Sequence, residues 1–183
     1  LIGIYENETA YSFTHSTIPL SVNNSTGISP ILCADLNTDG RNDLVVGTNT
    51  GGLIFAFNQN STYSLQERFT PSTSTFKGIE SAIFNNDNTD DLFIYGSAAM
   101  LIPFNDLLKE QPEYLAQNNG ARQGLITDLN NDGFQDIITS SNTNGLVSTH
   151  FGSQELSFEK VIVYQTPRNS YPVCLGDINE DGK

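Results

Sequence analysis

The sequence predicts an all-β fold built from repeated units of four short strands, and three observations lead to this prediction. The first is a carboxylate-rich loop, which spans Asp35–Asp43, returns as Asp128–Asp136 and begins again at Asp177–Gly182. The second is the spacing of its copies, and the third is a series of short apolar segments separated by Gly/Asn turns. Repeats of about 40 to 50 residues with several strands each are typical of a β-propeller, in which every repeat forms one four-stranded blade.

The spacing becomes regular once a degraded copy of the loop at residues 83–91 is included. Asp91 then corresponds to Asp43, and the successive intervals between equivalent positions are 48, 45 and 49 residues. In the degraded copy the first position is Ile83 instead of an acid, and the sixth is Asn88, a residue that tolerates a left-handed backbone. We therefore expect weak or no metal binding at this second loop.

The strands of each unit follow from its pattern of apolar and turn residues. One apolar strand enters the loop, a second leaves it, and a third and a more polar fourth follow a Gly/Asn turn. The expected strands are 31–34, 44–47, 53–57 and 63–69 in the first complete unit, and 125–127, 137–139, 146–150 and 156–163 in the third.

Both chain ends are expected to lie within blades. The first residues resemble the second half of a unit, and the last loop stops before its ninth position, which would fall at residue 185. We expect about four blade equivalents of a longer chain, whose remaining blades would complete the propeller beyond both termini. The expected units are 1–22 (end of a preceding blade), 23–71, 72–117, 118–165 and 166–183 (start of a next blade).

The loop spacing predicts a cation site. Oxygen-bearing side chains at positions 1, 3, 5 and 9 can converge on one hard cation, together with the backbone carbonyl of position 7, and calcium takes six to eight such ligands. Glycine at position 6 permits the sharp turn. The expected ligands are Asp35, Asn37, Asp39, Asp43 and the Arg41 carbonyl; Asp128, Asn130, Asp132, Asp136 and the Phe134 carbonyl; and Asp177, Asn179 and Asp181.

Two alternatives compete with this interpretation. An EF-hand loop also has alternating oxygen ligands and a glycine at position 6, but it requires a bidentate Glu at position 12, where these loops have Val46 and Thr139. Simple turn preference for Asp, Asn and Gly would explain one such loop. Three loops in register favour the cation site.

The loop pattern Asp-x-[Asp/Asn]-x-Asp-Gly-x-x-Asp, complete at 35–43 and 128–136, resembles the FG-GAP repeats, also called VCBS-like repeats. These repeats are best known from the β-propeller of integrin α subunits. The resemblance implies a propeller that commonly has seven blades, with calcium bound by the loop that joins the first two strands of a blade. The phenylalanine-glycine and glycine-alanine-proline signatures of the family are mostly absent, and Phe151-Gly152 is the nearest fragment.

Composition narrows the expected environment. The net charge is −13 with eight Lys and Arg and no basic run, so nucleic-acid binding is not expected. No apolar run approaches the roughly 20 residues needed to span a bilayer. Asn-x-Ser/Thr motifs and calcium loops indicate a secreted, extracellular or cell-surface glycoprotein. The candidate glycosylation sites are Asn7, Asn23, Asn24 and Asn60.

The cysteines and histidines suggest no catalytic site. Cys33 and Cys174 are too few for a disulfide framework, and we expect buried free thiols. His15 and His150 are expected to be exposed strand residues, because neither belongs to a zinc-ligand or triad pattern. The chain is therefore not expected to be an enzyme.

Three functions stay open on the sequence alone. The first is a non-catalytic, calcium-stabilised scaffold for protein or glycan recognition and cell adhesion. The second is a structural subunit of an extracellular or surface assembly. The third is an accessory domain of a secreted enzyme whose catalytic part lies elsewhere.

Overall fold

The computed structural model describes residues 2–9, 12–18, 27–60, 62–69, 75–85, 87–104, 113–115, 120–141, 143–168 and 173–177. Within these ranges the chain forms only β-strands, so the predicted all-β class is confirmed. The strands are β1 (Ile2–Thr9), β2 (Ser12–Ile18), β3 (Ile28–Ala34), β4 (Asp43–Thr48), β5 (Gly52–Asn58), β6 (Tyr63–Phe69), β7 (Phe76–Ala82), β8 (Asp91–Gly96), β9 (Met100–Ile102), β10 (Glu113–Tyr114), β11 (Gln123–Thr127), β12 (Asp136–Ser141), β13 (Leu146–Phe151) and β14 (Lys160–Gln165).

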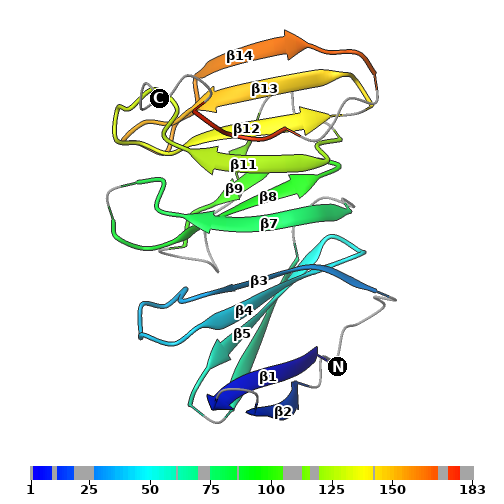
Figure 1. The fold of residues 1–183 in the computed structure, drawn as a ribbon, viewed down its shortest axis with the longest axis vertical. Helices are drawn as coiled ribbons and strands as arrows, with labels where there is room; N and C mark the ends of the chain where they lie inside the picture. The colour runs from blue at the N-terminus through cyan, green and yellow to red at the C-terminus, as the bar shows by residue number, and fades with distance from the viewer. Residues whose placement is uncertain are drawn as a thin grey trace.

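The described strands make four antiparallel sheets in chain order. A hairpin of β1 and β2 precedes three four-stranded sheets, β3-β4-β5-β6, β7-β8-β9-β10 and β11-β12-β13-β14. Figure 1 shows the sheets following one another along the long axis of the molecule, with β3, β7 and β11 at corresponding places. The sheets form an open array within the described residues and do not close into a ring.

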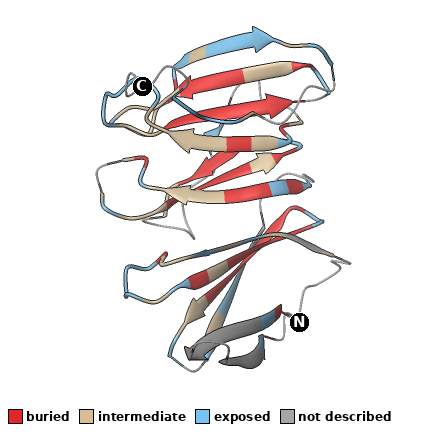
Figure 2. Cartoon of the chain, viewed as in Figure 1, coloured by how far each residue is buried: buried red, intermediate tan, exposed pale blue. Residues whose placement is uncertain are grey.

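The sheets pack face to face because alternate residues of a strand point to opposite faces. On β8, Leu92 and Ile94 join a buried cluster with Val45 and Phe55 of the preceding sheet. Phe93, between them, packs with Ile137 of the following sheet. Figure 2 shows buried positions, in red, along the inner strands of the four-stranded sheets. The middle sheet therefore supplies one face to each of its neighbours.

The continuous apolar runs in the sequence correspond to the second strand of each sheet, which is largely buried. In β4 only Leu44 is partly exposed, and every residue of β12 is buried. A strand covered on both faces loses the polar alternation of a surface strand. Between β4 and β5, Gly51 donates its N–H to the Thr48 carbonyl at 3.2 Å and adopts a φ of 82°. The predicted Gly/Asn turn therefore lies at this hairpin.

The fourth strand of the last sheet begins later than predicted. The sequence predicted a strand over 156–163, whereas β14 begins at Lys160. Leu156 has a φ of 55° and donates its N–H to the Ser153 carbonyl at 3.2 Å, which places it in a turn. Phe158 is then buried against Phe84 of the preceding sheet, with ring centroids 5.9 Å apart. The apolar residues at 156 and 158 thus serve the turn and the packing between sheets.

Candidate metal centre

The carboxylate-rich loops occupy the same place in three consecutive sheets. Each joins the first strand of its sheet to the second: residues 35–42 lie between β3 and β4, 83–90 between β7 and β8, and 128–135 between β11 and β12. Because the three strand pairs have the same orientation, the loops lie at one end of the sheets, on the left in Figure 1. The predicted recurrence is therefore spatial as well as sequential.

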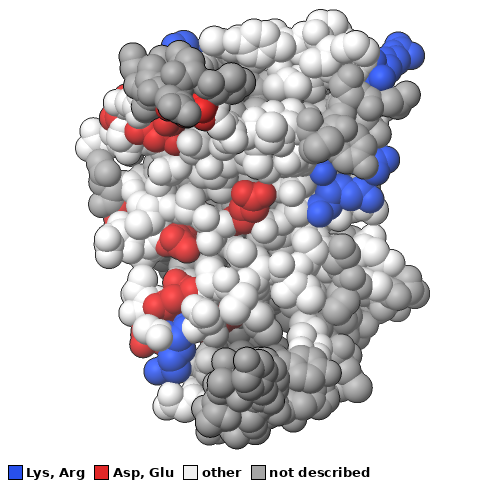
Figure 3. Space-filling view, in the orientation of Figure 1, with Lys and Arg blue, Asp and Glu red and all other residues white. Residues whose placement is uncertain are grey.

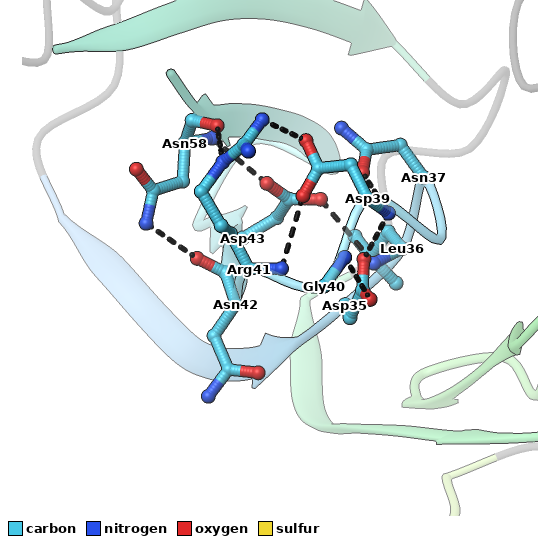
Figure 4. A network of polar contacts seen from close by, with 9 residues as sticks. All are labelled: Asp35, Leu36, Asn37, Asp39, Gly40, Arg41, Asn42, Asp43 and Asn58. Carbon is cyan, nitrogen blue, oxygen red and sulfur yellow. Dashed lines mark hydrogen bonds and ion pairs between the residues drawn. The ribbon is translucent and has the colours of Figure 1, made fainter. Parts of the chain in front are cut away.

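In the first loop the side-chain oxygens turn toward backbone N–H groups of the loop itself. Asp35 accepts hydrogen bonds from the N–H groups of Asp39 at 3.0 Å and Gly40 at 2.8 Å. Asn37 Oδ1 also accepts from the Asp39 N–H, at 3.1 Å, and Asp39 accepts from the Arg41 N–H at 3.0 Å. Figure 4 shows that these three side chains gather on the inside of one tight turn.

The loop at 128–136 repeats this geometry. Asp128 accepts from the N–H groups of Asp132 at 3.1 Å and Gly133 at 2.9 Å, and Asp132 accepts from Phe134 at 2.9 Å. Asn130 Oδ1 shares the Asp132 N–H at 3.0 Å. The glycine is needed for its backbone angle, since its φ is 91° and a Cβ would meet nothing within 4 Å.

The aspartate at the ninth position has a structural role that the sequence did not reveal. Asp43 is fully buried and accepts two backbone hydrogen bonds, from Leu36 at 3.2 Å and from Asn58 at 2.8 Å. The first holds the start of the loop, and the second holds the end of the third strand. A carboxylate that links these two segments stabilises the sheet with or without a metal.

The same two bonds recur at the equivalent aspartates of the other sheets. Asp136 accepts from Leu129 and from Gly152, both at 2.9 Å. Asp91 accepts from Phe84 at 3.3 Å and from Phe104 at 3.0 Å. Because Asp91 belongs to the degraded loop, this arrangement does not depend on a complete set of metal ligands. An aspartate occurs at the ninth position of all three loops, including the degraded one. This recurrence in the sequence could have indicated its structural role.

Burial sets the electrostatics of these three carboxyl groups. Desolvation raises the pKa of Asp43 and of Asp136 above the ordinary value, while the backbone N–H bonds to each carboxylate act in the opposite direction. At Asp91 desolvation is the largest effect and raises the pKa to about 6. The ninth position therefore carries a carboxyl group whose charge is costly unless donors or a cation stabilise it.

The donor chemistry of the two complete loops fits a hard cation. Carboxylate, amide and carbonyl oxygens are the ligands that calcium prefers. A carboxylate oxygen that accepts one N–H bond also keeps a second acceptor position. Across the described ranges, however, no three His, Cys, Asp or Glu side chains are grouped so as to hold a metal. The residues that would hold calcium are Asp35, Asn37, Asp39, Asp43 and the Arg41 carbonyl in the first loop, and Asp128, Asn130, Asp132, Asp136 and the Phe134 carbonyl in the other.

The two complete loops differ at their seventh position. In the first, the Arg41 guanidinium forms an ion pair with the Asp39 carboxylate and donates from Nε to the Asn58 carbonyl at 3.0 Å. In the other loop the residue is Phe134, and the Asn130 side-chain amide donates to the second Asp132 oxygen at 2.8 Å. A cation would therefore compete with an internal positive charge in the first loop only.

The degraded loop keeps the turn and loses a ligand. Asn85 accepts from the Asp87 N–H at 2.9 Å, and Asp87 accepts from the Thr89 N–H at 2.8 Å. Asn88 adopts a φ of 63°, as its place at the glycine position predicted. Ile83 at the first position is 44% exposed and offers no side-chain oxygen.

The remaining predicted sites have mixed outcomes. Asp177 is exposed, whereas Asn179 and Asp181 lie outside the described residues, as do Asn23 and Asn24. Asn7 lies in β1, and the structure does not describe its side chain. Asn60 is exposed in the turn before β6, with a φ of 70°.

The predicted burial of the cysteines is wrong. Cys33 and Cys174 are free, but both are exposed. On β3 the alternation places Leu32 and Ala34 against the core and leaves Ile31 and Cys33 on the opposite side. The apolar run 31–34 did not reveal which of its two faces was covered.

His150 lies in a strand as predicted, but its predicted exposure is wrong. Its side chain is fully buried in β13, the third strand of its sheet, between β12 and β14. Desolvation lowers the pKa of its imidazole to about 4, so the ring is neutral at physiological pH. The side chain of His15, in β2, is not described.

The interpretation of this site rests on its geometry. No protein-family model matches the chain, and no curated protein is significantly similar to it. Within the described residues, no helix has the length and apolar character required to cross a membrane.

Proposed function

We propose that the chain is part of an extracellular, calcium-stabilised β-propeller of FG-GAP-like blades, which acts as a non-catalytic scaffold for protein or glycan recognition and cell adhesion. The observation that carries this proposal is the recurrence of one loop at the same end of three consecutive, face-packed, four-stranded sheets. In a propeller each such sheet is one blade, and further blades would complete the ring.

Calcium has a structural role in this proposal. The complete loops bring three carboxylates each to the end of a sheet, and their mutual repulsion decreases when a divalent cation binds. The cation would also fix the start of the second strand, where Asp43 and Asp136 already hold two segments together. Recognition would then use the surface of a rigid array rather than the cation itself.

Thermal unfolding with and without calcium tests the bracing role. We expect calcium to raise the unfolding midpoint of the native chain, and a chelator to lower it. Asp39→Ala and Asp132→Ala should each reduce the calcium-dependent part of the shift. Asp87→Ala, the same change at the fifth position of the degraded loop, is the matched control and should leave that part unchanged. An unfolding midpoint that does not change with calcium would contradict the proposal.

A recognition role needs its own test. Glycan arrays and protein pull-downs with the full chain, in calcium, should yield a saturable ligand whose binding is lost on chelation. If calcium does not raise the unfolding midpoint, the scaffold proposal fails. If calcium raises the midpoint but no ligand is found, the structural role described below is favoured.

A structural subunit is the second candidate, and the outer edge of the last sheet favours it. In β14, Ile162, Val163 and Tyr164 are 37%, 43% and 56% exposed. Within the described residues β14 pairs only with β13, so its other edge carries unpaired backbone groups. An apolar edge strand can pair with a strand of a second copy. We expect light scattering to detect a dimer that Val163→Lys abolishes and that Gln66→Lys on β6 does not affect. A monomer at all concentrations would reject this candidate.

A further inference from the structure

The end of the sheets opposite the carboxylate loops carries two exposed cations, Lys77 and Arg122. Neither forms an ion pair with any residue that the structure describes. This is unusual in a chain of net charge −13. Figure 3 shows a group of blue side chains at the edge of the molecule opposite the red carboxylates of the loops.

The two cations occupy the same position of consecutive repeats. Lys77 precedes Asp91 by the same number of residues as Arg122 precedes Asp136. Each therefore stands where the first strand of its sheet begins, and these first strands, β7 and β11, lie against each other. The repeat architecture thus brings together two like charges that are far apart in the chain.

A β-bulge determines the direction of Lys77. Phe76 pairs with Gly96 and Gly78 pairs with Tyr95, so Lys77 is the extra residue between two consecutive pairs. A bulge re-aims the side chain of its extra residue and interrupts the regular alternation of the strand. Here it occurs beside a pocket that both cations line.

The pocket is small and polar. It has a volume of about 90 Å³ and lies between the sheet of β7–β10 and the sheet of β11–β14. A typical small-molecule site is about 300–1,000 Å³, so this pocket fits one functional group of a ligand and a few waters rather than a whole metabolite. None of the described residues that line it is acidic; its polar lining includes Thr75, Lys77, Ser97, Arg122 and Thr143.

The hydroxyl groups of this pocket add a donor to the two charges. Thr75 Oγ1 and Ser97 Oγ share one hydrogen bond at 3.0 Å, and Ser97 Oγ also accepts from the Thr75 N–H at 3.3 Å. Two hydroxyls that share one bond use one of their two hydrogens, so one O–H is left to donate. The backbone N–H groups of Gly120 and Arg122 already donate to the carbonyls of Ser97 and Ser140.

We propose that this pocket binds one oxyanion group of a ligand, a carboxylate, sulfate or phosphate, through Lys77 and Arg122 with a hydroxyl donor from the Thr75–Ser97 pair. Guanidinium and ammonium groups form the strong, charge-assisted hydrogen bonds that such a group accepts. Binding also relieves the repulsion between the two neighbouring cations. The site does not require calcium, so it goes beyond the proposed scaffold function.

Titration of the full, isotope-labelled chain with sodium sulfate, phosphate and acetate tests the site by NMR, at constant ionic strength set with sodium chloride. We expect saturable shifts at the amides of Lys77, Ser97 and Arg122 for at least one of the three anions. Sulfate or phosphate would indicate a sulfated or phosphorylated ligand, and acetate would indicate a carboxylate. Lys77→Gln and Arg122→Gln should each weaken binding about tenfold, the loss expected for one charge-assisted hydrogen bond.

The matched control is Arg168→Gln, which removes an exposed positive charge that does not line the pocket. It should leave the dissociation constant within about twofold of the native value, because salt largely screens an exposed charge that makes no direct contact with the anion. Shifts that fail to saturate with all three anions, or that weaken equally in all three variants, would overturn the proposal. Calcium stabilisation of the same samples, measured separately, reports on the scaffold function independently.

Discussion

Asp91 accepts a hydrogen bond from the backbone N–H of Phe104, 3.0 Å away and beyond the end of β9, although its own loop has no acid at the first position. The equivalent bonds join Asp43 to Asn58 and Asp136 to Gly152, both in loops that carry the full ligand pattern. The ninth aspartate is therefore part of the framework of each sheet. In the two complete loops this framework also presents the candidate calcium ligands.

Removing the Asp91 carboxylate should destabilise the fold without any effect of calcium. Asp91→Ala leaves the buried N–H groups of Phe84 and Phe104 without their acceptor, and each unsatisfied donor costs about 1–3 kcal/mol. We expect a loss of roughly 2–5 kcal/mol in the free energy of unfolding, measured with urea in the presence of a chelator. Asp87→Ala should cost much less. Equal losses in the two variants would show that the pair of backbone bonds is not the cause.

Asp91 should also give a pH dependence of a definite sign. Its pKa in the folded chain is about 6, above the ordinary 3.8, so the folded state binds the proton more tightly. Its contribution to stability is therefore fully present below about pH 4 and is lost as the pH rises through about 6. Asp91→Asn removes this dependence. The unfolding free energy of the native chain minus that of this variant should fall as the pH rises from 4 to 7; a difference that stays constant with pH would contradict the assignment.

His150 should act in the opposite direction. The unfolded chain protonates its imidazole near pH 6.5, whereas the folded chain does so only near pH 4. Its burial therefore destabilises the fold as the pH falls from about 6.5 to 4, by roughly 3 kcal/mol. His150→Gln should lessen the acid sensitivity of the unfolding free energy, whatever its effect at pH 7. NMR titration of the His150 ring gives the folded pKa directly, and a value near 6.5 would refute the expected burial effect.

Arg41 should weaken calcium binding at the first loop. Its ion pair with Asp39 is partly exposed, and such pairs contribute about 0.2–1 kcal/mol. If this loop binds calcium, Arg41→Gln should tighten it a few-fold, as measured by calorimetry. Phe134→Leu, at the same position of the other loop, should not change its affinity. Weaker binding in Arg41→Gln would mean that the arginine supports the site rather than competing with the cation.

The sequence predicted those features that a short pattern determines locally. Loop length, the left-handed residue at the sixth position and the apolar second strands follow from backbone geometry and from the period of the repeat. Asn88 is an example, because its φ of 63° matches its place at the glycine position.

Features that depend on neighbouring sheets were not predictable in the same way. Cys33 is exposed because the other side of β3 faces the core, and the apolar run 31–34 does not say which side that is. His150 is buried although its strand, β13, is largely polar, and the strand's own sequence does not say which of its faces is covered. The hydrogen bonds of Asp43 to Leu36 and Asn58 required knowing where the third strand ends. Each of these depends on the packing of segments rather than on the residue type.

Calcium stoichiometry of the purified chain is the most direct test of the central claim that the two complete loops are calcium sites. Equilibrium dialysis followed by metal analysis would compare the native chain with Asp39→Ala, Asp132→Ala and Asp87→Ala. We predict that the first two variants each lose one bound calcium and that Asp87→Ala loses none. A native chain that binds no calcium, or equal stoichiometry in all four proteins, would contradict the account.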